Sequence, residues 1–297
     1  MKKVKKIDIH IHITPKKRIP RFMGDNEDIL TVTQIRSIYD ELGIELGVDL
    51  PCVTPEAQYY LKTNEESYEL AQTFPETLDW FCNLDPRMGG NSTETDFSKF
   101  INYYKEMGAK GVGEIMSNMY FDDPRTLNLF KHCEACKMPV LFHIGGPVGD
   151  YGLIDDLGLP RLEKVLQMFP NLQFLGHSQK FWAEISSDVT EEGRYGFPTG
   201  KVTPGRVVEL MRKYPNLCGD LSAGSGGNAV MRDPEFGYAF LEEFQDRLYF
   251  GTDICSVKNE RPLSFWLDKA CEDGNISQIA YEKICRENAY ALLHRKL

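Results

Sequence analysis

Short apolar runs alternate with longer amphipathic stretches along most of the chain. The runs are rich in β-branched and aromatic residues and have the length of strands, so we expect strands there. They cover residues 4–13, 44–50, 78–84, 111–115, 140–144, 173–177, 217–221 and 247–253. Most of them are followed by a stretch with helical periodicity, as in a chain built from repeated strand–helix units.

The expected helices cover residues 97–107, 126–136, 161–168, 204–213 and 236–244, and helical stretches at 263–271 and 277–294 close the chain. Pro124, Pro160 and Pro204 lie at or near helix starts, where a missing N–H costs little. The alternation predicts the α/β class. Eight strand–helix units in 297 residues predict a (β/α)₈ TIM barrel, whose typical length is about 250 residues. We expect a single domain over residues 1–297.

A doubly wound open sheet is the structural alternative. That fold usually places a glycine-rich phosphate-binding loop directly after the first strand. Here the first strand runs into His-Ile-Thr-Pro-Lys, with no glycine. The sequence therefore favours the barrel, in which the chemistry lies at the C-terminal ends of the strands.

Composition narrows the class of protein and its partners. The chain is 42% hydrophobic and 26% charged, typical of a folded soluble protein. Its formal charge of −10 argues against nucleic acid as the main partner, since lysines gather only near the N-terminus. No apolar run reaches the roughly 18 residues of a membrane-spanning helix. We expect a cytoplasmic enzyme with reduced cysteines and a small-molecule substrate, with a homo-oligomer as an open alternative.

The first strand carries the clearest candidate chemistry. Strand residues alternate between two faces, so His10 and His12 are expected to point into the barrel mouth. The four isoleucines at positions 7, 9, 11 and 13 are expected on the outer face. Two imidazoles on one face suit a divalent cation, which takes nitrogen ligands at about 2.0–2.1 Å.

Three further strand ends add polar groups to the same place. His143 ends the fifth strand, His177 ends the sixth, and Asp253 ends the hydrophobic eighth strand. A carboxylate in such a position is costly unless it is paired or bound to metal. Asp253 could bind a metal through one oxygen and accept a proton from water with the other. A helix cap or a loop salt bridge is its alternative role.

Five segments carry a resemblance to a known family. They are DIHIHI in the first strand, LFHIGG in the fifth, FLGHSQ in the sixth, YFGTDIC in the eighth and ENAYALL in the last helix. Together, and in this order, they resemble the amidohydrolase superfamily. More narrowly, they resemble the amidohydrolase-related branch that includes aminocarboxymuconate semialdehyde decarboxylase and the resorcylate-type decarboxylases.

The resemblance implies roles for individual residues. His10, His12, His143 and Asp253 would be metal ligands, and His177 would hold the metal-bound water or act on the substrate. Asp253 and His177 are thus the catalytic candidates. Zinc is the expected metal, with manganese or iron as alternatives and one or two ions per site.

The fourth strand departs from the pattern of many superfamily members. Those proteins place there a lysine that is carbamylated and bridges two metals. This chain has Glu114 at the strand top, and Lys110 lies two pleats lower. Glu114 could ligate or bridge a metal, or it could orient a histidine. The sequence leaves these roles open.

Two segments that follow predicted strands are also candidates for a functional role. Residues 179–202 form a long loop with several aromatic residues, which indicates a lid or a dimer contact. The glycine-rich segment 223–228 is expected to be a flexible loop rather than a phosphate cradle. Arg18, Arg194 and Arg232 are available to bind a substrate carboxylate.

Three hypotheses of function follow. The first is a metal-dependent hydrolase that acts on an amide, ester or lactone through metal-activated water. The second is a non-oxidative decarboxylase or hydratase that acts on a small carboxylic acid. The third, a metal-binding scaffold without catalysis, would predict a missing ligand, and none of the four is absent.

Overall fold

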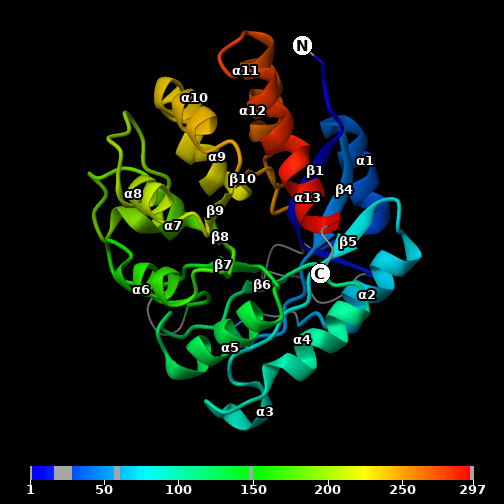
Figure 1. Cartoon of the computed structure of the whole chain (residues 1–297). Helices are drawn as coiled ribbons and strands as arrows, with labels where there is room; N and C mark the ends of the chain where they lie inside the picture. The colour runs from blue at the N-terminus through cyan, green and yellow to red at the C-terminus, as the bar shows by residue number, and fades with distance from the viewer. Residues whose placement is uncertain (1, 17–28, 57–60, 147–149, 295–297) are drawn as a thin grey trace.

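The computed structural model describes residues 2–16, 29–56, 61–146, 150–294 and shows a parallel β-barrel surrounded by helices (Figure 1). The barrel strands are β1 (Lys6–Ile11), β4 (Ile44–Asp49), β5 (Leu78–Trp80), β6 (Val112–Ile115), β7 (Val140–His143), β8 (Phe174–His177), β9 (Leu217–Asp220) and β10 (Leu248–Tyr249). All eight overlap the strands expected from the sequence. Two-residue strands β2 (Ile13–Thr14) and β3 (Leu30–Thr31) pair outside the barrel.

Backbone hydrogen bonds close the barrel. The strands form the series β1-β4-β5 and β10-β9-β8-β7-β6. Between β5 and β6, the amide of Cys82 donates to the carbonyl of Gly111 at 3.0 Å. Between β10 and β1, the amide of Ile9 donates to the carbonyl of Phe250 at 3.0 Å. The predicted TIM barrel is thereby confirmed.

Helices cover the outside of the barrel. They are α1 (Val32–Leu42), α2 (Asn64–Thr73), α3 (Met88–Asn91), α4 (Phe97–Glu106), α5 (Pro124–Ala135), α6 (Pro160–Met168), α7 (Gln179–Ala183), α8 (Arg206–Lys213), α9 (Ala223–Met231), α10 (Pro234–Glu243), α11 (Pro262–Glu272), α12 (Gln278–Glu282) and α13 (Asn288–His294). A short 3₁₀ helix, η1 (Gly193–Tyr195), and a short π-helix, η2 (Lys283–Glu287), complete the order. Proline begins α5, α6, α10 and α11, where its fixed φ suits the first turn.

Two apolar clusters hold these layers together. The larger lies between the strands and the helices, and the smaller includes Leu141, Leu175 and Cys218 from the successive barrel strands β7, β8 and β9. Helix α13 packs Leu292 and Leu293 against the smaller cluster. This explains why the last helix is apolar although it carries no chemistry.

The first strand does not alternate evenly between its two faces. Ile11 belongs to the outer cluster as expected, but Ile7 and Ile9 belong to the inner one. The pairing of β1 with β4 is irregular between Asp8 and Ile11, and such a bulge shifts the facing of the following residues. The expectation that all four isoleucines face outward is therefore wrong, although His10 and His12 still reach the mouth.

The long sixth loop is partly core. Phe181 and Trp182 lie in α7 and are almost fully buried, and the Phe181 ring occupies the space that a side chain at Gly176 would need. By contrast, Tyr195 and Phe197 are exposed. The lid role can therefore apply only to the later part of the loop. Removing the whole segment would remove part of the core.

The glycine-rich segment after β9 is helical, so the expectation of a flexible loop is wrong. It forms the first two turns of α9. The reason is close packing, because a Cβ at Gly226 would lie 2.3 Å from the backbone of Leu221. Here glycine permits a helix to approach its neighbour, and the contact outweighs the low helix propensity of glycine.

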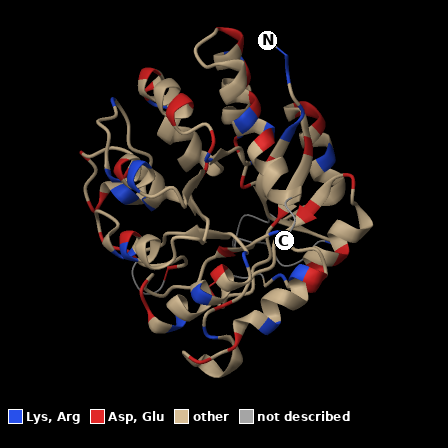
Figure 2. Ribbon diagram, in the orientation of Figure 1, with Lys and Arg blue, Asp and Glu red and all other residues tan. Residues whose placement is uncertain are grey.

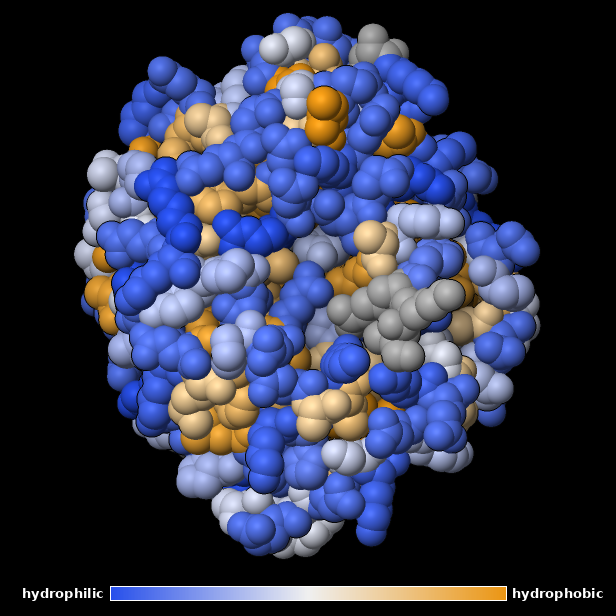
Figure 3. All heavy atoms as spheres, in the orientation of Figure 1, coloured by the Kyte–Doolittle hydropathy of each residue, from blue (hydrophilic) through white to orange (hydrophobic). Residues whose placement is uncertain are grey.

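The surface and the thiols agree with the composition. Charged residues of both signs lie mainly on the outer helices and loops (Figure 2), and the face shown in Figure 3 is mostly hydrophilic. All eight cysteines are free and buried, as expected. Within the described ranges, no helix is long and apolar enough to cross a membrane.

Replacing Phe181 tests whether the start of the sixth loop belongs to the core. We expect Phe181→Ala to lower the free energy of unfolding by about 3–5 kcal/mol, because it leaves a cavity over β8. The matched variant Phe197→Ala alters an exposed ring in the same segment and should change it by no more than about 0.5 kcal/mol. Urea unfolding followed by circular dichroism measures both. An equal loss of unfolding free energy in the two variants would contradict the conclusion that Phe181 belongs to the core and Phe197 does not.

Candidate metal centre

Seven polar residues meet at the C-terminal ends of the barrel strands. Parallel strands bring these ends to one side of the barrel, although the residues are far apart in the sequence. The residues are His10 and His12 from β1 and its end, Glu114 from β6, His143 from β7, His177 from β8, Asp220 from β9 and Asp253 from the segment after β10. The register of β7 and β8 places His143 opposite His177.

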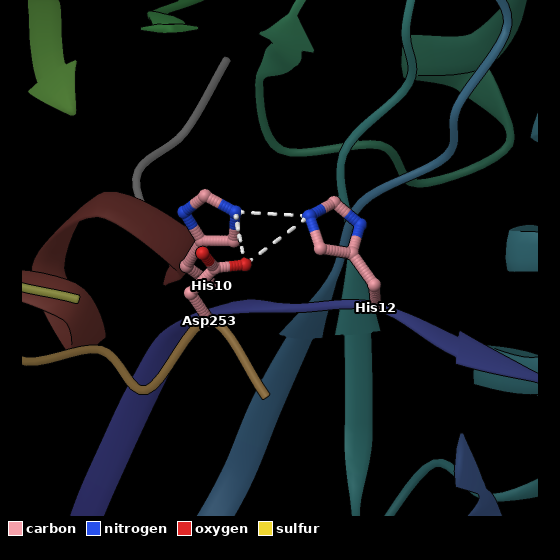
Figure 4. A group of neighbouring side chains, drawn as sticks. All are labelled: His10, His12 and Asp253. Atoms are coloured by element: carbon pink, nitrogen blue, oxygen red, sulfur yellow. Dashed lines mark hydrogen bonds and ion pairs between the residues drawn. The ribbon is translucent and has the colours of Figure 1, made fainter. Parts of the chain in front are cut away.

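His10, His12 and Asp253 form the centre of this group (Figure 4). The Nε2 atoms of the two histidines lie 3.1 Å apart. Oδ1 of Asp253 lies 3.4 Å from Nε2 of His10 and 3.5 Å from Nε2 of His12. All three atoms therefore face one point between the side chains.

Glu114 brings a fourth donor to the same point. Its Oε2 lies 3.5 Å from Nε2 of His10 and 3.3 Å from Nε2 of His12. Ligand atoms bound tetrahedrally at about 2.0–2.1 Å lie about 3.3 Å from one another. The observed separations match this spacing, so the residues fit a divalent cation with nitrogen and oxygen ligands.

Hydrogen bonds fix the two first-strand histidines in the tautomer that a metal requires. Nδ1 of His12 lies 3.1 Å from the carbonyl oxygen of Leu50, which can only accept, so this nitrogen carries the proton. Nδ1 of His10 donates to Oδ2 of Asp220 at 2.7 Å. In both rings the lone pair of Nε2 is left facing the centre, as in metal-bound histidines.

His177 is held next to the centre by Ser222. The hydroxyl of Ser222 donates to Oδ2 of Asp220 at 2.9 Å, so it accepts from Nδ1 of His177, also at 2.9 Å. Nε2 of His177 then lies 3.7 Å from Oε1 of Glu114 and 3.7 Å from Oδ2 of Asp253. The ring can thus act on a molecule bound above the centre.

His143 contacts the centre through Glu114. Its Nδ1 lies 2.7 Å from Oε1 of Glu114, and its ring packs against Tyr151 at 4.7 Å. Glu114 therefore faces the ligand atoms with one oxygen and orients a histidine with the other. The role of His143 as a direct ligand stays a prediction.

The centre is strongly charged and buried. Burial opposes the charged form of His10, yet the carboxylates of Asp253, Asp220 and Glu114 outweigh it and raise its pKa well above the ordinary value. Burial likewise acts to raise the pKa of Glu114, but His10 and the neighbouring hydrogen bonds hold it well below the ordinary value. A cation that binds here therefore replaces protons on the histidines.

The sequence argument missed Asp220 and Ser222. Both follow the hydrophobic run of β9 in the segment Leu-Cys-Gly-Asp-Leu-Ser. The argument that selected Asp253, an acid that ends a buried strand, applies equally to Asp220. No sequence signal distinguishes Ser222 from the other serines, since its role depends on the turn into α9.

The three arginines considered as binding groups for a substrate carboxylate lie in different surroundings. Arg194 is fully buried, and its Nε lies 2.8 Å from Oε1 of Glu184, so it is committed to a structural ion pair. Arg232 lines a separate cavity, and the residues that line this cavity include none of the metal-facing histidines or carboxylates. Arg18 lies outside the described residues.

Comparisons with known proteins concern the family and the fold. A family model described as Amidohydrolase matches residues 7–295. No curated protein matches the sequence. The match confirms the superfamily resemblance read from the strand motifs.

Three solved structures illustrate the similarity in fold. An uncharacterised TIM-barrel protein from Bordetella bronchiseptica shares 18% identity at a TM-score of 0.64, covering 98% of each chain. A 2,6-dihydroxybenzoate decarboxylase from Rhizobium shares 15% identity at a TM-score of 0.60, covering 97% of this chain and 98% of its own. A dihydroxybenzoic acid decarboxylase from Polaromonas sp. JS666, with bound manganese, shares 16% at a TM-score of 0.57, covering 97% and 96%.

Asp220 provides a test of how the centre is organised. We expect Asp220→Asn to weaken divalent-metal affinity by about 10–100-fold, because His10 loses its charged hydrogen-bond acceptor. Elemental analysis after dialysis against graded chelator buffers measures the affinity. The control Asp155→Asn also changes a buried carboxylate, but one that accepts from the amides of Arg161 and Leu162. It should leave the affinity unchanged. Equal affinities in both variants would contradict the role of Asp220.

The ligands themselves give a stronger effect. His10→Ala and His12→Ala should each abolish stoichiometric metal binding without unfolding the barrel, because both residues lie above the inner apolar cluster. Metal content and far-ultraviolet circular dichroism measure the two properties. Full metal content in either variant would disprove the assignment of the first-strand ligands.

Proposed function

The chain belongs to the amidohydrolase family, and we propose that it is a divalent-metal-dependent enzyme that decarboxylates a small unsaturated or aromatic carboxylic acid without oxidation. The observation that carries the proposal is that the two carboxylate oxygens of Asp253 face different partners. Its Oδ1 faces His10 and His12, whereas its Oδ2 faces His177. One carboxylate can therefore ligate a metal and still present a proton-carrying oxygen to a bound molecule.

His10, His12, Asp253 and Glu114 would hold the cation, and His143 would support Glu114 or complete the coordination. When bound, the cation acts as a Lewis acid that anchors and polarises oxygen atoms of the substrate. Zinc suits the nitrogen and oxygen donors, and manganese is the alternative because the Polaromonas relative contains it.

Asp253 and His177 would carry out the proton chemistry. Decarboxylation breaks a carbon–carbon bond, leaves the electron pair on the substrate carbon and releases CO₂. Protonated Oδ2 of Asp253 would deliver the proton that this carbon needs. His177, fixed by Ser222, would orient the substrate and return a proton to Asp253 for the next turnover.

Several decarboxylases among the similar structures support this choice, and a probable 2-pyrone-4,6-dicarboxylic acid hydrolase has the same fold over a similar share of the chain. Hydrolysis is the second candidate. The description of the matching family favours it, and Asp253 could equally accept a proton from water and pass it to a leaving group.

A substrate screen separates the two reactions. The metal-loaded protein is incubated in D₂O with a panel of hydroxybenzoic acids and related unsaturated acids, and CO₂ release is followed together with deuterium in the product. Decarboxylation should place one deuterium at the carbon that lost CO₂. A parallel panel of lactones, esters and amides tests hydrolysis. Turnover in the second panel alone would replace the proposed reaction with the hydrolytic one.

Asp253→Asn tests the proton-carrying role. The amide oxygen can still ligate, so the metal should remain largely bound, while kcat should fall by about 10²–10⁴-fold because the acid has gone. Elemental analysis and the CO₂ assay measure the two effects. Retained activity would show that another group supplies the proton.

His177→Asn should leave the metal fully bound and lower kcat with a changed pH profile, because a proton-transfer group has been removed. The same two assays apply across a range of pH. Loss of metal in this variant would make His177 a ligand rather than a positioning and proton-transfer residue.

A further inference from the structure

Asp8, two residues before His10 in β1, is fully buried and accepts four hydrogen bonds. Its Oδ1 accepts from the backbone amides of His10 at 3.2 Å and of Thr252 at 2.8 Å. Its Oδ2 accepts from the hydroxyls of Thr252 at 2.6 Å and of Tyr39 at 3.1 Å. A carboxylate has about four acceptor positions, so the protein already satisfies Asp8. Asp8 is therefore bound to the protein and is not a further metal ligand.

Two of these four bonds come from Thr252, the residue directly before Asp253. Thr252 donates through both its backbone amide and its hydroxyl. The hydroxyl oxygen of Thr252 also accepts from the amide of Ile254 at 3.2 Å. The contacts of Thr252 thus hold the chain on both sides of Asp253.

Asp253 has a backbone conformation that needs such support. Its φ is 52°, in the left-handed region that residues other than glycine seldom adopt. A residue keeps this conformation where the surrounding structure determines it. The amide of Asp253 donates to the carbonyl of His10 at 2.8 Å, and the amide of His12 donates to the carbonyl of Ile254 at 3.0 Å. With its backbone held in this way, Asp253 directs Oδ1 at the two histidines and Oδ2 at His177.

Gly251 allows the same segment to lie close to the other supporting groups of the centre. A Cβ at this position would lie 2.8 Å from Oδ1 of Asp220 and 2.8 Å from Cβ of Ser222. Three consecutive residues therefore have three different roles. Gly251 permits the close approach, Thr252 binds Asp8, and Asp253 faces the metal centre.

Tyr39 contacts Asp8 from the helix layer. It lies on α1, is almost fully buried, and donates to the same oxygen of Asp8 as the hydroxyl of Thr252 does. A Cβ at Gly47 in β4 would overlap the Tyr39 hydroxyl, so glycine provides room for this contact. The bond from Tyr39 connects Asp8 to α1, whereas the bonds from Thr252 connect Asp8 to Asp253. The two contributions can therefore be separated by substitution.

We propose that Asp8 and Thr252 are a pair of positioning residues for Asp253. The carboxylate of Asp8 holds Thr252, and Thr252 fixes the backbone of Asp253 so that Oδ1 faces the metal and Oδ2 faces His177. This role rests on Asp253 being a metal ligand, as proposed above, and is independent of which reaction the centre catalyses.

Cobalt binding tests the proposal without a substrate. The affinity of the full chain for Co²⁺ is measured by competition with a chelator, and the visible spectrum of bound Co²⁺ reports the geometry of its ligands. Thr252→Val removes the hydroxyl but keeps the shape of the side chain. It should weaken Co²⁺ affinity by about 10–100-fold and change the spectrum. Thr252→Ser keeps a hydroxyl and should restore both properties.

Tyr39→Phe is the matched control, because it removes the other hydroxyl that donates to Oδ2 of Asp8. It should leave the affinity and the spectrum unchanged. Asp8→Asn should reduce the affinity as Thr252→Val does, since it replaces one acceptor by a donor. Asp8 is deeply buried, so the proposal is judged on Thr252→Val, and urea unfolding establishes that each variant is folded before titration.

Asp253→Ala shows whether Thr252 acts through Asp253. Affinity should fall in this variant, and adding Thr252→Val should cause no further loss. Wild-type affinity in Asp253→Ala would remove Asp253 from the ligands, and the proposed mechanism would fail together with the positioning role. If Asp253→Ala loses affinity, the positioning role alone is overturned by wild-type affinity in Thr252→Val, by an equal loss in Tyr39→Phe, or by additive losses in the double variant.

Discussion

The arrangement of the metal centre depends on the hydrogen bond between Nδ1 of His10 and Oδ2 of Asp220. It joins β1 to β9 across 210 positions of sequence, and neither side chain is exposed. Because Asp220 can only accept, the bond places the proton of His10 on Nδ1 and leaves Nε2 for a metal. The same carboxylate accepts from Ser222, which in turn holds His177. The backbone carbonyl of Asp220 accepts from Nε1 of Trp182, so a core residue of the sixth loop also supports this point.

Periodicity was sufficient to predict the barrel. All eight strands lie within the apolar runs, because buried parallel strands are nearly continuous in their hydrophobicity. Periodicity was also sufficient to predict that His10, His12 and Asp253 lie close together, since the barrel topology places the C-terminal ends of all strands at one mouth. Details that depend on tertiary contact were missed. The bulge in β1, the helix at Ala223–Met231 and the burial of Phe181 all arise from packing against residues distant in the sequence.

The sixth loop illustrates how one segment can serve both stability and function. Its length and aromatic content predicted a lid, and both are also properties of a segment that packs into the core. Only the structure separates Trp182, which is buried against β9, from Phe197, whose side chain is half exposed. The length and composition of a loop show that it contains apolar side chains. They do not show which of these side chains pack against the barrel.

The centre contains three buried or partly buried carboxylates, and their hydrogen bonds determine which of them can ligate. Oδ1 of Asp220 accepts from the amide of Ser222, and its Oδ2 accepts from His10 and from the hydroxyl of Ser222. Both oxygens are thus satisfied by the protein, so Asp220 has no reason to exchange these partners for a cation. Glu114 has one oxygen directed at Nε2 of His10 and Nε2 of His12, and Asp253 is in the same position. In the absence of both protons and a cation, these two nitrogens and the facing carboxylate oxygens would all be acceptors directed at one another. Such an arrangement of acceptors is favourable only when protons or a cation lie between them. We therefore expect Glu114 and Asp253 to bind the metal and Asp220 to hold His10 in place for it.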